Sequence, residues 1–120
     1  MKYFNFVTGL KMCNDKKWKQ LFGIPPRNSE SKITQDYMNL AIAIQQVTED
    51  IVFKLAKTAK EITKKDYLVM AGGVALNSVA NGKLLKSGIF KDIWIQPAAG
   101  DAGGSIGAAL ATWHIGQPHE

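Results

Sequence analysis

The sequence has one cysteine, one arginine and no long apolar run, and each scarcity narrows what the chain can be. With Cys13 alone, it cannot form an internal disulfide framework or a cysteine-rich zinc site, and a lone thiol is typical of a reducing compartment. No stretch reaches the roughly 18 apolar residues of a membrane span. The amino-terminal residues also lack the apolar core of a secretory signal. We therefore expect a soluble, cytoplasmic protein without membrane contact.

The positive charge comes from lysine. The net charge of +5 arises from 14 lysines and Arg27, which are spread over several segments. Surfaces that read bases favour arginine and interleaved aromatic residues, so we expect no nucleic-acid partner. Solvated faces explain most of this charge, although a phosphate-bearing substrate or an acidic partner chain would also suit it.

The chain is short enough for one domain. Its 120 residues, 46% of them hydrophobic, lie in the usual range of a compact unit, so residues 1–120 are expected to form a single domain. The aromatic and β-branched residues 3–7 predict a short strand. Residues 10–31 carry Gly23, Pro25 and Pro26 and predict a loop with a helical turn near Trp18 and Leu21.

A long amphipathic helix should follow. Thr34 stands at the expected N-cap, and Lys64 and Lys65 suit the negative end of the helix dipole. Apolar residues recur between these points at steps of three and four, as on one face of a helix. They are Tyr37, Leu40, Ile44, Val47, Ile51, Leu55, Ala59 and Ile62.

The remaining chain alternates between strand and helix patterns. Residues 67–71 predict a strand buried on both faces, and residues 92–96 predict a second strand that Pro97 ends. Helical spacing occupies residues 74–85 and 106–114. This order is typical of an α/β fold with a mostly parallel sheet and packed helices.

Glycine-rich turns follow both predicted strands. Ligands of open α/β sheets gather at the carboxyl ends of the strands, so Gly72, Gly73 and Asn77 would lie at that edge. The glycines allow close backbone approach, and the Asn77 amide could contact a ribose or a phosphate. Spacing alone leaves simple tight turning as the alternative, because neither turn matches a named nucleotide fingerprint.

Asp101 is the only carboxylate of the second turn, residues 100–105. It could bind a metal ion or hold a water beside a phosphate. It could equally cap the following helix, which is a common role for aspartate at that position. The residues alone leave both alternatives open.

Several segments together resemble one family. The sequence is similar to the O-carbamoyltransferases related to nodulation protein U and to the cephamycin and tobramycin tailoring enzymes, and the resemblance covers nearly the whole chain. It is carried mainly by AGGVALN at residues 71–77, VANG at 79–82 and IWIQPAAGDAGG at 93–104. Shorter matches are YFN at 3–5, TGL at 8–10, LFG at 21–23, PPR at 25–27 and QQVTE at 45–49.

The resemblance implies a function. Such enzymes use carbamoyl phosphate and ATP to make carbamoyl-adenylate, and they pass the carbamoyl group to a hydroxyl of a sugar or natural product. Gly72, Gly73 and Asn77 match the motif that contacts the adenylate, and Asp101 matches a ligand of the catalytic divalent metal, often iron. The implied fold is half of an actin-like, ribonuclease-H-like ATPase domain, specifically its carboxy-terminal part. A homo-oligomer is compatible with this assignment.

This sequence departs from the family in one respect. It has no match to the histidine pair that supplies the other metal ligands, and no residue of the chain is assigned a catalytic role. We therefore expect the chain alone to be inactive in carbamoyl transfer. Alternatives are a non-catalytic module that binds a nucleotide or a partner, and another actin-like phosphotransferase. Arg27 receives no role.

Overall fold

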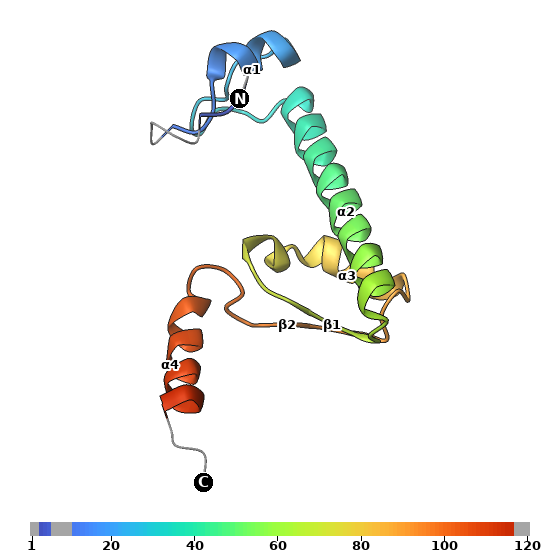
Figure 1. Cartoon of the computed structure of the whole chain (residues 1–120). Helices are drawn as coiled ribbons and strands as arrows, with labels where there is room; N and C mark the ends of the chain where they lie inside the picture. The colour runs from blue at the N-terminus through green and yellow to red at the C-terminus, as the bar shows by residue number, and fades with distance from the viewer. Residues whose placement is uncertain (1–2, 6–10, 117–120) are drawn as a thin grey trace. The chain divides into compact units, whose positions relative to one another are not determined.

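The structure is a computed structural model that describes residues 3–5 and 11–116. It divides into two compact units, Met1–Gln45 and Gln46–Glu120. Their boundary falls within the long helix α2, Gln35–Thr63. Each unit is described by itself below, and Figure 1 gives the order of the elements along the chain.

The first unit contains α1, Asp15–Phe22, and the start of α2. Asn14 caps α1 by accepting a hydrogen bond from the Lys17 N–H at 3.2 Å. Gly23 ends the helix at φ +75°, a conformation that glycine adopts without strain. The helical turn predicted near Trp18 and Leu21 is therefore confirmed. Of the strand predicted at residues 3–7, Phe4 forms an isolated antiparallel bridge with Cys13, and residues 6 and 7 lie outside the described residues.

The long helix is confirmed as α2. Its predicted apolar face is not its buried face, because Val52 and Ala56 are buried whereas Ile51 and Leu55 are 51% and 65% exposed. It begins immediately after Thr34, whose carbonyl accepts from the Met38 N–H at 3.2 Å. It ends at Thr63, since the next residue, Lys64, has φ +56°. No helix among the described residues combines the length and apolar character that crossing a bilayer requires.

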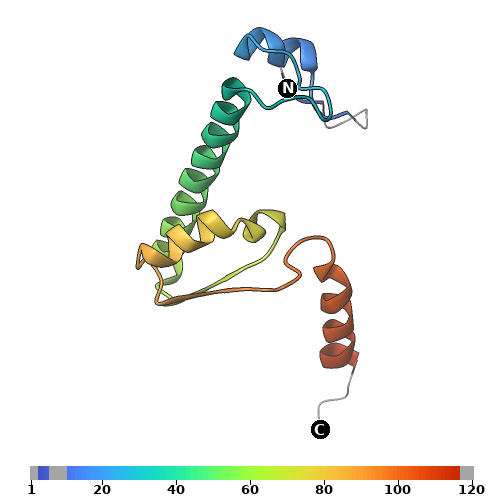
Figure 2. The ribbon, with the colours of Figure 1, turned by 180° about the vertical axis from the view of Figure 1, so that it is seen from behind.

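The second unit continues from α2 into a parallel strand pair. Strand β1 is Tyr67–Met70 and β2 is Asp92–Ile95, with Tyr67 opposite Asp92 and Met70 opposite Ile95. Between them lie the short 3-10 helix η1, Gly73–Leu76, and α3, Ser78–Lys86. Helix α4, Gly103–Gly116, follows β2. Figures 1 and 2 show the two strands side by side with α3 alongside them.

A small core lies between α2, α3 and one face of the strands. Val52, Ala56, Leu84 and Phe90 form its buried cluster. Partly buried residues of both strands pack against it, including Leu68, Met70 and Ile93. The prediction of an α/β fold with parallel strands is confirmed for this unit.

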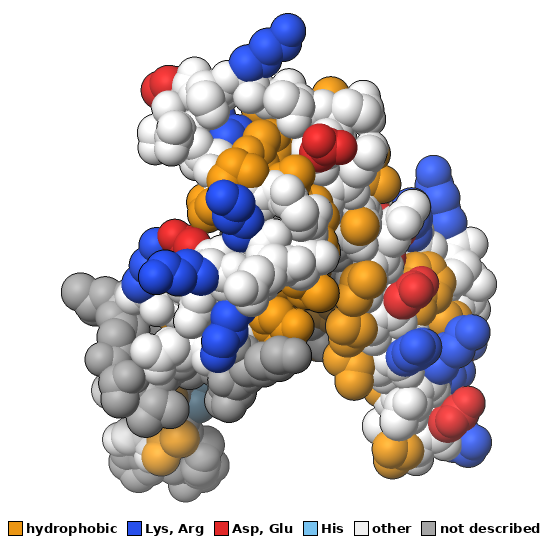
Figure 3. All heavy atoms as spheres, turned by 90° about the horizontal axis from the view of Figure 1, so that it is seen from above, with side chains coloured by type: hydrophobic (Ala, Val, Ile, Leu, Met, Phe, Trp, Pro, Cys, Tyr) orange, Lys and Arg blue, Asp and Glu red, His pale blue; other side chains and the backbone are white. Residues whose placement is uncertain are grey.

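Two details of the prediction were wrong. The helix predicted over residues 74–85 is broken at Asn77, whose extended backbone separates η1 from α3. The strand at Tyr67–Met70 is covered on one face only, so Tyr67 and Val69 are 69% and 68% exposed. The apolar run predicted burial on both faces, but the described residues place helices against only one. Figure 3 shows that apolar side chains also reach the surface elsewhere, among the lysines.

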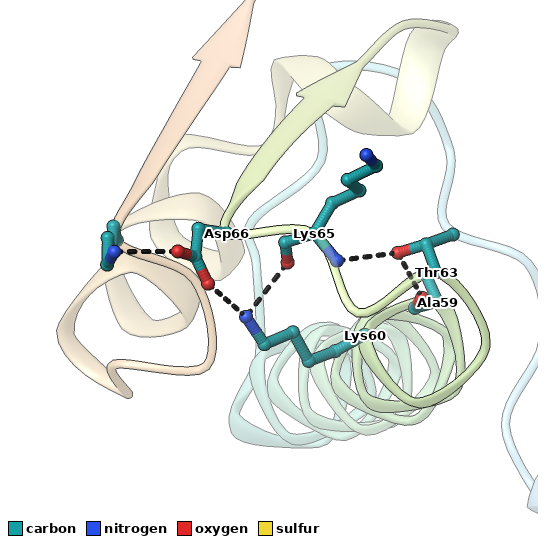
Figure 4. Close-up of polar contacts among 6 residues, drawn as sticks. Ala59, Lys60, Thr63, Lys65 and Asp66 are labelled. Carbon is teal, nitrogen blue, oxygen red and sulfur yellow. Dashed lines mark hydrogen bonds and ion pairs between the residues drawn. The ribbon is translucent and has the colours of Figure 1, made fainter.

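An ion cluster joins the end of α2 to both strands. The Asp66 carboxylate accepts from Lys60 Nζ at 2.9 Å and pairs with Lys91 Nζ at 2.6 Å. Lys60 Nζ also donates to the Lys65 carbonyl, as Figure 4 shows. The hydrogen bond from Lys60 and then that from Lys91 lower the pKa of Asp66 from 3.8 to about 2. Asp66 therefore favours the folded state only while it is ionised.

Asp66→Asn is expected to reduce the acid sensitivity of the fold. Because the folded-state pKa lies below the unfolded one, the stability that Asp66 contributes is present above about pH 4 and lost as pH falls toward 2. Urea unfolding midpoints between pH 5 and pH 2 should fall less steeply in the variant, which should be less stable than wild type at pH 7. Asp50→Asn, on the exposed face of α2, is the control. An identical pH slope in wild type and Asp66→Asn would contradict this account.

Candidate functional site

The two glycine-rich turns meet at one edge of the strand pair. β1 and β2 are parallel, so the turns that follow them leave from the same edge. The Gly72 N–H, after β1, donates to the Ala99 carbonyl, after β2, at 2.7 Å. The expectation that both turns share one edge is therefore confirmed by a direct backbone hydrogen bond.

The two glycines of the first turn differ in whether the backbone conformation requires glycine. Gly72 has φ +99° and ψ 162°, a backbone conformation that residues with a Cβ rarely adopt. Gly73 has ordinary dihedrals, and a Cβ built there would meet no heavy atom within 4 Å beyond its neighbours. Gly72 is thus explained by the turn itself, whereas the space beside Gly73 stays open to an approaching group.

Asn77 has a local structural role. Its side-chain oxygen accepts from the Ala80 N–H at 3.1 Å and caps α3. Its own N–H donates to the Val74 carbonyl at 3.0 Å, which closes η1. Capping explains the break in the predicted helix, because an N-cap residue has an extended backbone. The predicted contact between Asn77 and a nucleotide stays a prediction.

Asp101 is exposed in the turn before α4. Its backbone carbonyl accepts from the Gly104 N–H at 3.2 Å, but its carboxylate forms no hydrogen bond or ion pair within the described part of the chain. Side-chain capping of α4, the simpler alternative for this aspartate, is therefore not observed. Within residues 3–5 and 11–116, no group of three or more histidine, cysteine, aspartate or glutamate side chains could hold a metal ion. Asp101 can supply one ligand, and these residues do not fit a complete metal site.

Two residues matter more to this edge than the sequence indicated. A Cβ at Gly103 would lie 2.3 Å from the Ala98 carbonyl oxygen, so any other residue there would require the loop backbone to shift. Asn81 Nδ2 donates to the Ala75 carbonyl at 2.7 Å and ties α3 to η1. In the sequence, Gly103 and its neighbour Gly104 looked equivalent. Only the folded turn shows that a Cβ would clash at Gly103 and not at Gly104. Asn81 belongs to the VANG segment that carries the resemblance, but nothing in the sequence indicated its contact with η1.

The second unit also has an apolar cavity of about 270 Å³ between α2 and the first turn. Leu55, Ala56, Leu68, Val74 and Leu84 are among its lining residues. Val74 and Leu55 are 59% and 65% exposed, so the cavity opens to the surface. It suits an apolar side chain better than a phosphate, because its lining contains no charged side chain.

Arg27 belongs to a different cavity, within the first unit. It lines a space of about 320 Å³ with Trp18, Phe22 and Tyr37, among others. The Arg27 guanidinium donates to the Ser31 carbonyl, and Tyr37 Oη donates to the Pro25 carbonyl at 3.0 Å. Arg27 thus closes the turn at residues 27–31, and Tyr37 contacts the Pro25–Pro26 segment.

The second unit therefore defines a class of protein: an α/β unit whose parallel strands present two hydrogen-bonded glycine-rich turns at one edge. Comparison with known families makes the assignment particular. The model of the carbamoyltransferase N-terminus matches residues 1–110, and the chain belongs to that family.

Several curated proteins are also similar to this chain. An uncharacterized protein of Synechocystis is 59% identical over 114 residues, which are 95% of this chain and 18% of the relative. Nodulation protein NolNO of Sinorhizobium fredii is 48% identical over 90 residues, covering 75% of this chain and 13% of the relative. Nodulation protein NolO of Bradyrhizobium diazoefficiens is 41% identical over 99 residues, covering 82% of this chain and 18% of the relative. The chain thus spans less than a fifth of the length of these relatives.

Proposed function

We propose that this chain carries part of the nucleotide and metal site of an O-carbamoyltransferase. In the complete reaction, a carbamoyl group would pass from carbamoyl phosphate, through carbamoyl-adenylate made with ATP, to a hydroxyl of a sugar or another natural product. The observation that supports this most is the 2.7 Å hydrogen bond from the Gly72 N–H to the Ala99 carbonyl. It brings the motif expected to contact the adenylate beside the turn that carries Asp101.

The first turn would seat the nucleotide. The space next to Gly73 lets a phosphate or ribose approach the backbone, and the N-terminus of α3 favours negative charge. Asn77 stands at that helix start, where its amide would reach a bound group while its oxygen keeps capping α3. In this proposal, β1, α3 and β2 belong to one half of an actin-like ATPase domain.

The second turn would supply one metal ligand. The exposed Asp101 carboxylate suits a divalent cation such as iron or magnesium, although the described residues offer no complete ligand set. Further ligands would have to come from elsewhere in a longer protein. A bound metal would supply Lewis-acid polarisation of the carbamoyl carbonyl. The role of this chain is to hold Asp101 beside the nucleotide turn.

An exposed free thiol at Cys13 is in keeping with a reducing cytoplasm.

Calorimetric titration with ADP, with and without a divalent metal, tests the proposal. We expect the chain to bind ADP, and Asn77→Ala to weaken binding about tenfold through a lost hydrogen bond. Asn77→Ser is the matched control. Serine also caps helices but has no amide, so weaker ADP binding by Asn77→Ser would come from loss of the amide and not from loss of the cap. Asp101→Asn should remove the metal-dependent part of the affinity and leave ADP binding without metal unchanged.

Three results would count against the proposal. Binding of ADP that neither Asn77→Ala nor Asp101→Asn alters would place the nucleotide elsewhere. Detectable carbamoyl transfer by the chain alone would overturn the view that these residues form only part of a site. Transfer of phosphate instead of a carbamoyl group would favour another actin-like phosphotransferase, and product analysis with carbamoyl phosphate separates the two.

A partner-binding module is a second candidate function, favoured by one observation on α2. Val47, Ile51 and Leu55 recur every four residues and are 51%, 51% and 65% exposed. Such a stripe on a helix is usually covered by other protein. A longer protein would supply that cover itself, which is compatible with the carbamoyltransferase proposal.

A further inference from the structure

Asn81, in the first half of α3, contacts the turn that precedes its helix. Its Nδ2 donates to the Ala75 carbonyl, six residues earlier, at 2.7 Å. Ala75 lies in η1 and is 2% exposed, so its carbonyl is held in the interior of the turn. A backbone carbonyl can only accept, which fixes the orientation of the Asn81 amide with its nitrogen toward Ala75.

This contact is the first of three hydrogen bonds that lead to the second turn. The Ala75 N–H donates to the Gly72 carbonyl at 3.0 Å. The Gly72 N–H in turn donates to the Ala99 carbonyl at 2.7 Å. A side chain of α3 is thereby connected, through the backbone N–H and carbonyl groups of Ala75 and Gly72, to the loop that carries Asp101.

The oxygen of the Asn81 amide destabilises the fold. This Oδ1 is buried and has no hydrogen-bond partner among the described residues. A buried acceptor without a partner destabilises a fold, and an apolar side chain of the same size would avoid that cost. The gain from an asparagine here must therefore come from its donor, which is the group that holds Ala75.

We infer that Asn81 is the positioning residue of this edge: it fixes η1 through the Ala75 carbonyl and, through Gly72, sets the two glycine-rich turns against each other. The effect of Asn81 on nucleotide binding rests on the proposed function. The effect of Asn81 on the positions of the two turns is independent of that function, because it concerns hydrogen bonds within the chain.

Two nearly isosteric variants test the inference by amide NMR of the full chain. Asn81→Asp loses its donor when ionised and regains an O–H donor when protonated. At pH 7 the Gly72 and Ala75 amide resonances should therefore shift and exchange at least tenfold faster with solvent. They should return toward the wild-type positions as pH is lowered through the pKa of the new carboxyl. Asn81→Leu should show the same loosened turn at every pH.

Matched controls separate positioning from general effects. The wild-type chain, titrated in parallel, corrects for its own carboxylates, and Asn39→Asp makes the same chemical change on α2 in the first unit. Neither should alter the Gly72 and Ala75 amides in the pH-reversible way expected of Asn81→Asp. Unchanged amides in both Asn81 variants would overturn the inference. So would a uniform loss of protection across α2 and α3, because Asn81 would then be a general determinant of the fold.

Adding ADP to the same samples tests the link to function separately. If the wild-type chain binds ADP, Asn81→Asp should bind about tenfold more weakly at pH 7 and recover at low pH. A wild-type chain that ignores ADP would count against the proposed function alone, since the turn resonances still report on Asn81. Equal ADP affinity in wild type and both Asn81 variants, in samples whose turn amides have shifted, would show that positioning of the turn does not affect ADP binding. That result would overturn the link between Asn81 and nucleotide binding.

Discussion

Gly103→Ala is expected to destabilise the second unit by about 2–3 kcal/mol, as overpacking against a fixed backbone does. The new Cβ would lie 2.3 Å from the Ala98 carbonyl oxygen and 3.0 Å from Gln96 Oε1. The glutamine side chain can move, but the Ala98 carbonyl belongs to the same loop as Ala99, which accepts the hydrogen bond from Gly72. Relieving the clash should therefore also disturb the contact between the two turns.

Gly104→Ala is the matched control for this prediction. A Cβ at Gly104 would meet no heavy atom within 4 Å outside its own helix backbone, and its φ is not positive. Because alanine favours helix over glycine, this variant should stabilise the chain by up to about 1 kcal/mol. Urea unfolding followed by circular dichroism measures both. Equal stability of the two variants would show that the turn relaxes freely, and the steric account of Gly103 would be wrong.

The elements of this fold were predictable where local pattern decides them. Apolar spacing over some 30 residues predicted α2, and the structure ends that helix at Thr63, next to the predicted lysines. Short apolar runs bounded by glycine and proline predicted β1 and β2, and their order predicted parallel pairing. In each case neighbouring residues carry enough information to choose between helix and strand.

Features that depend on distant atoms were not predictable in this way. Asn77 lies inside an apolar pattern of helical spacing, and its capping of α3 is visible only once the helix is known to begin at Ser78. The exposure of Val69 depends on what covers the outer face of the strand, which no residue near it encodes. Gly103 and Gly104 look equivalent in sequence because the carbonyl that separates them belongs to Ala98 in the folded loop.

The candidate site was predictable in outline. Parallel strands place their following turns at one edge, so Gly72, Gly73 and Asp101 could be expected near each other, and the Gly72–Ala99 hydrogen bond confirms that the turns meet. The identity of the ligands was not predictable from the residues alone, because it depends on the groups that the two turns face. Resemblance supplied the adenylate and the metal, and both stay predictions, since the described residues offer a metal only the Asp101 carboxylate and no complete ligand set.

The core of the second unit is small enough that one side chain should control it, and Leu84→Ala is expected to cost about 3 kcal/mol. Leu84 is 1% exposed and packs with Val52, Ala56 and Phe90. Truncation would leave a void between α2 and α3, and the few remaining buried side chains could not close it. The unfolding midpoint in urea should fall accordingly, with cooperativity lost if the core no longer holds α3.

The adjacent Leu85 provides the control, since it is the same residue type on the same helix but is 47% exposed. Leu85→Ala should change the free energy of unfolding by less than about 1 kcal/mol, because most of its surface already faces solvent. A large difference between the two variants would mean that α3 is anchored through its buried face, the condition that Asn81 needs to hold the Gly72–Ala75 turn. Similar effects would mean that α3 is not docked on α2, and the arrangement of the two turns would then depend on their own hydrogen bonds alone.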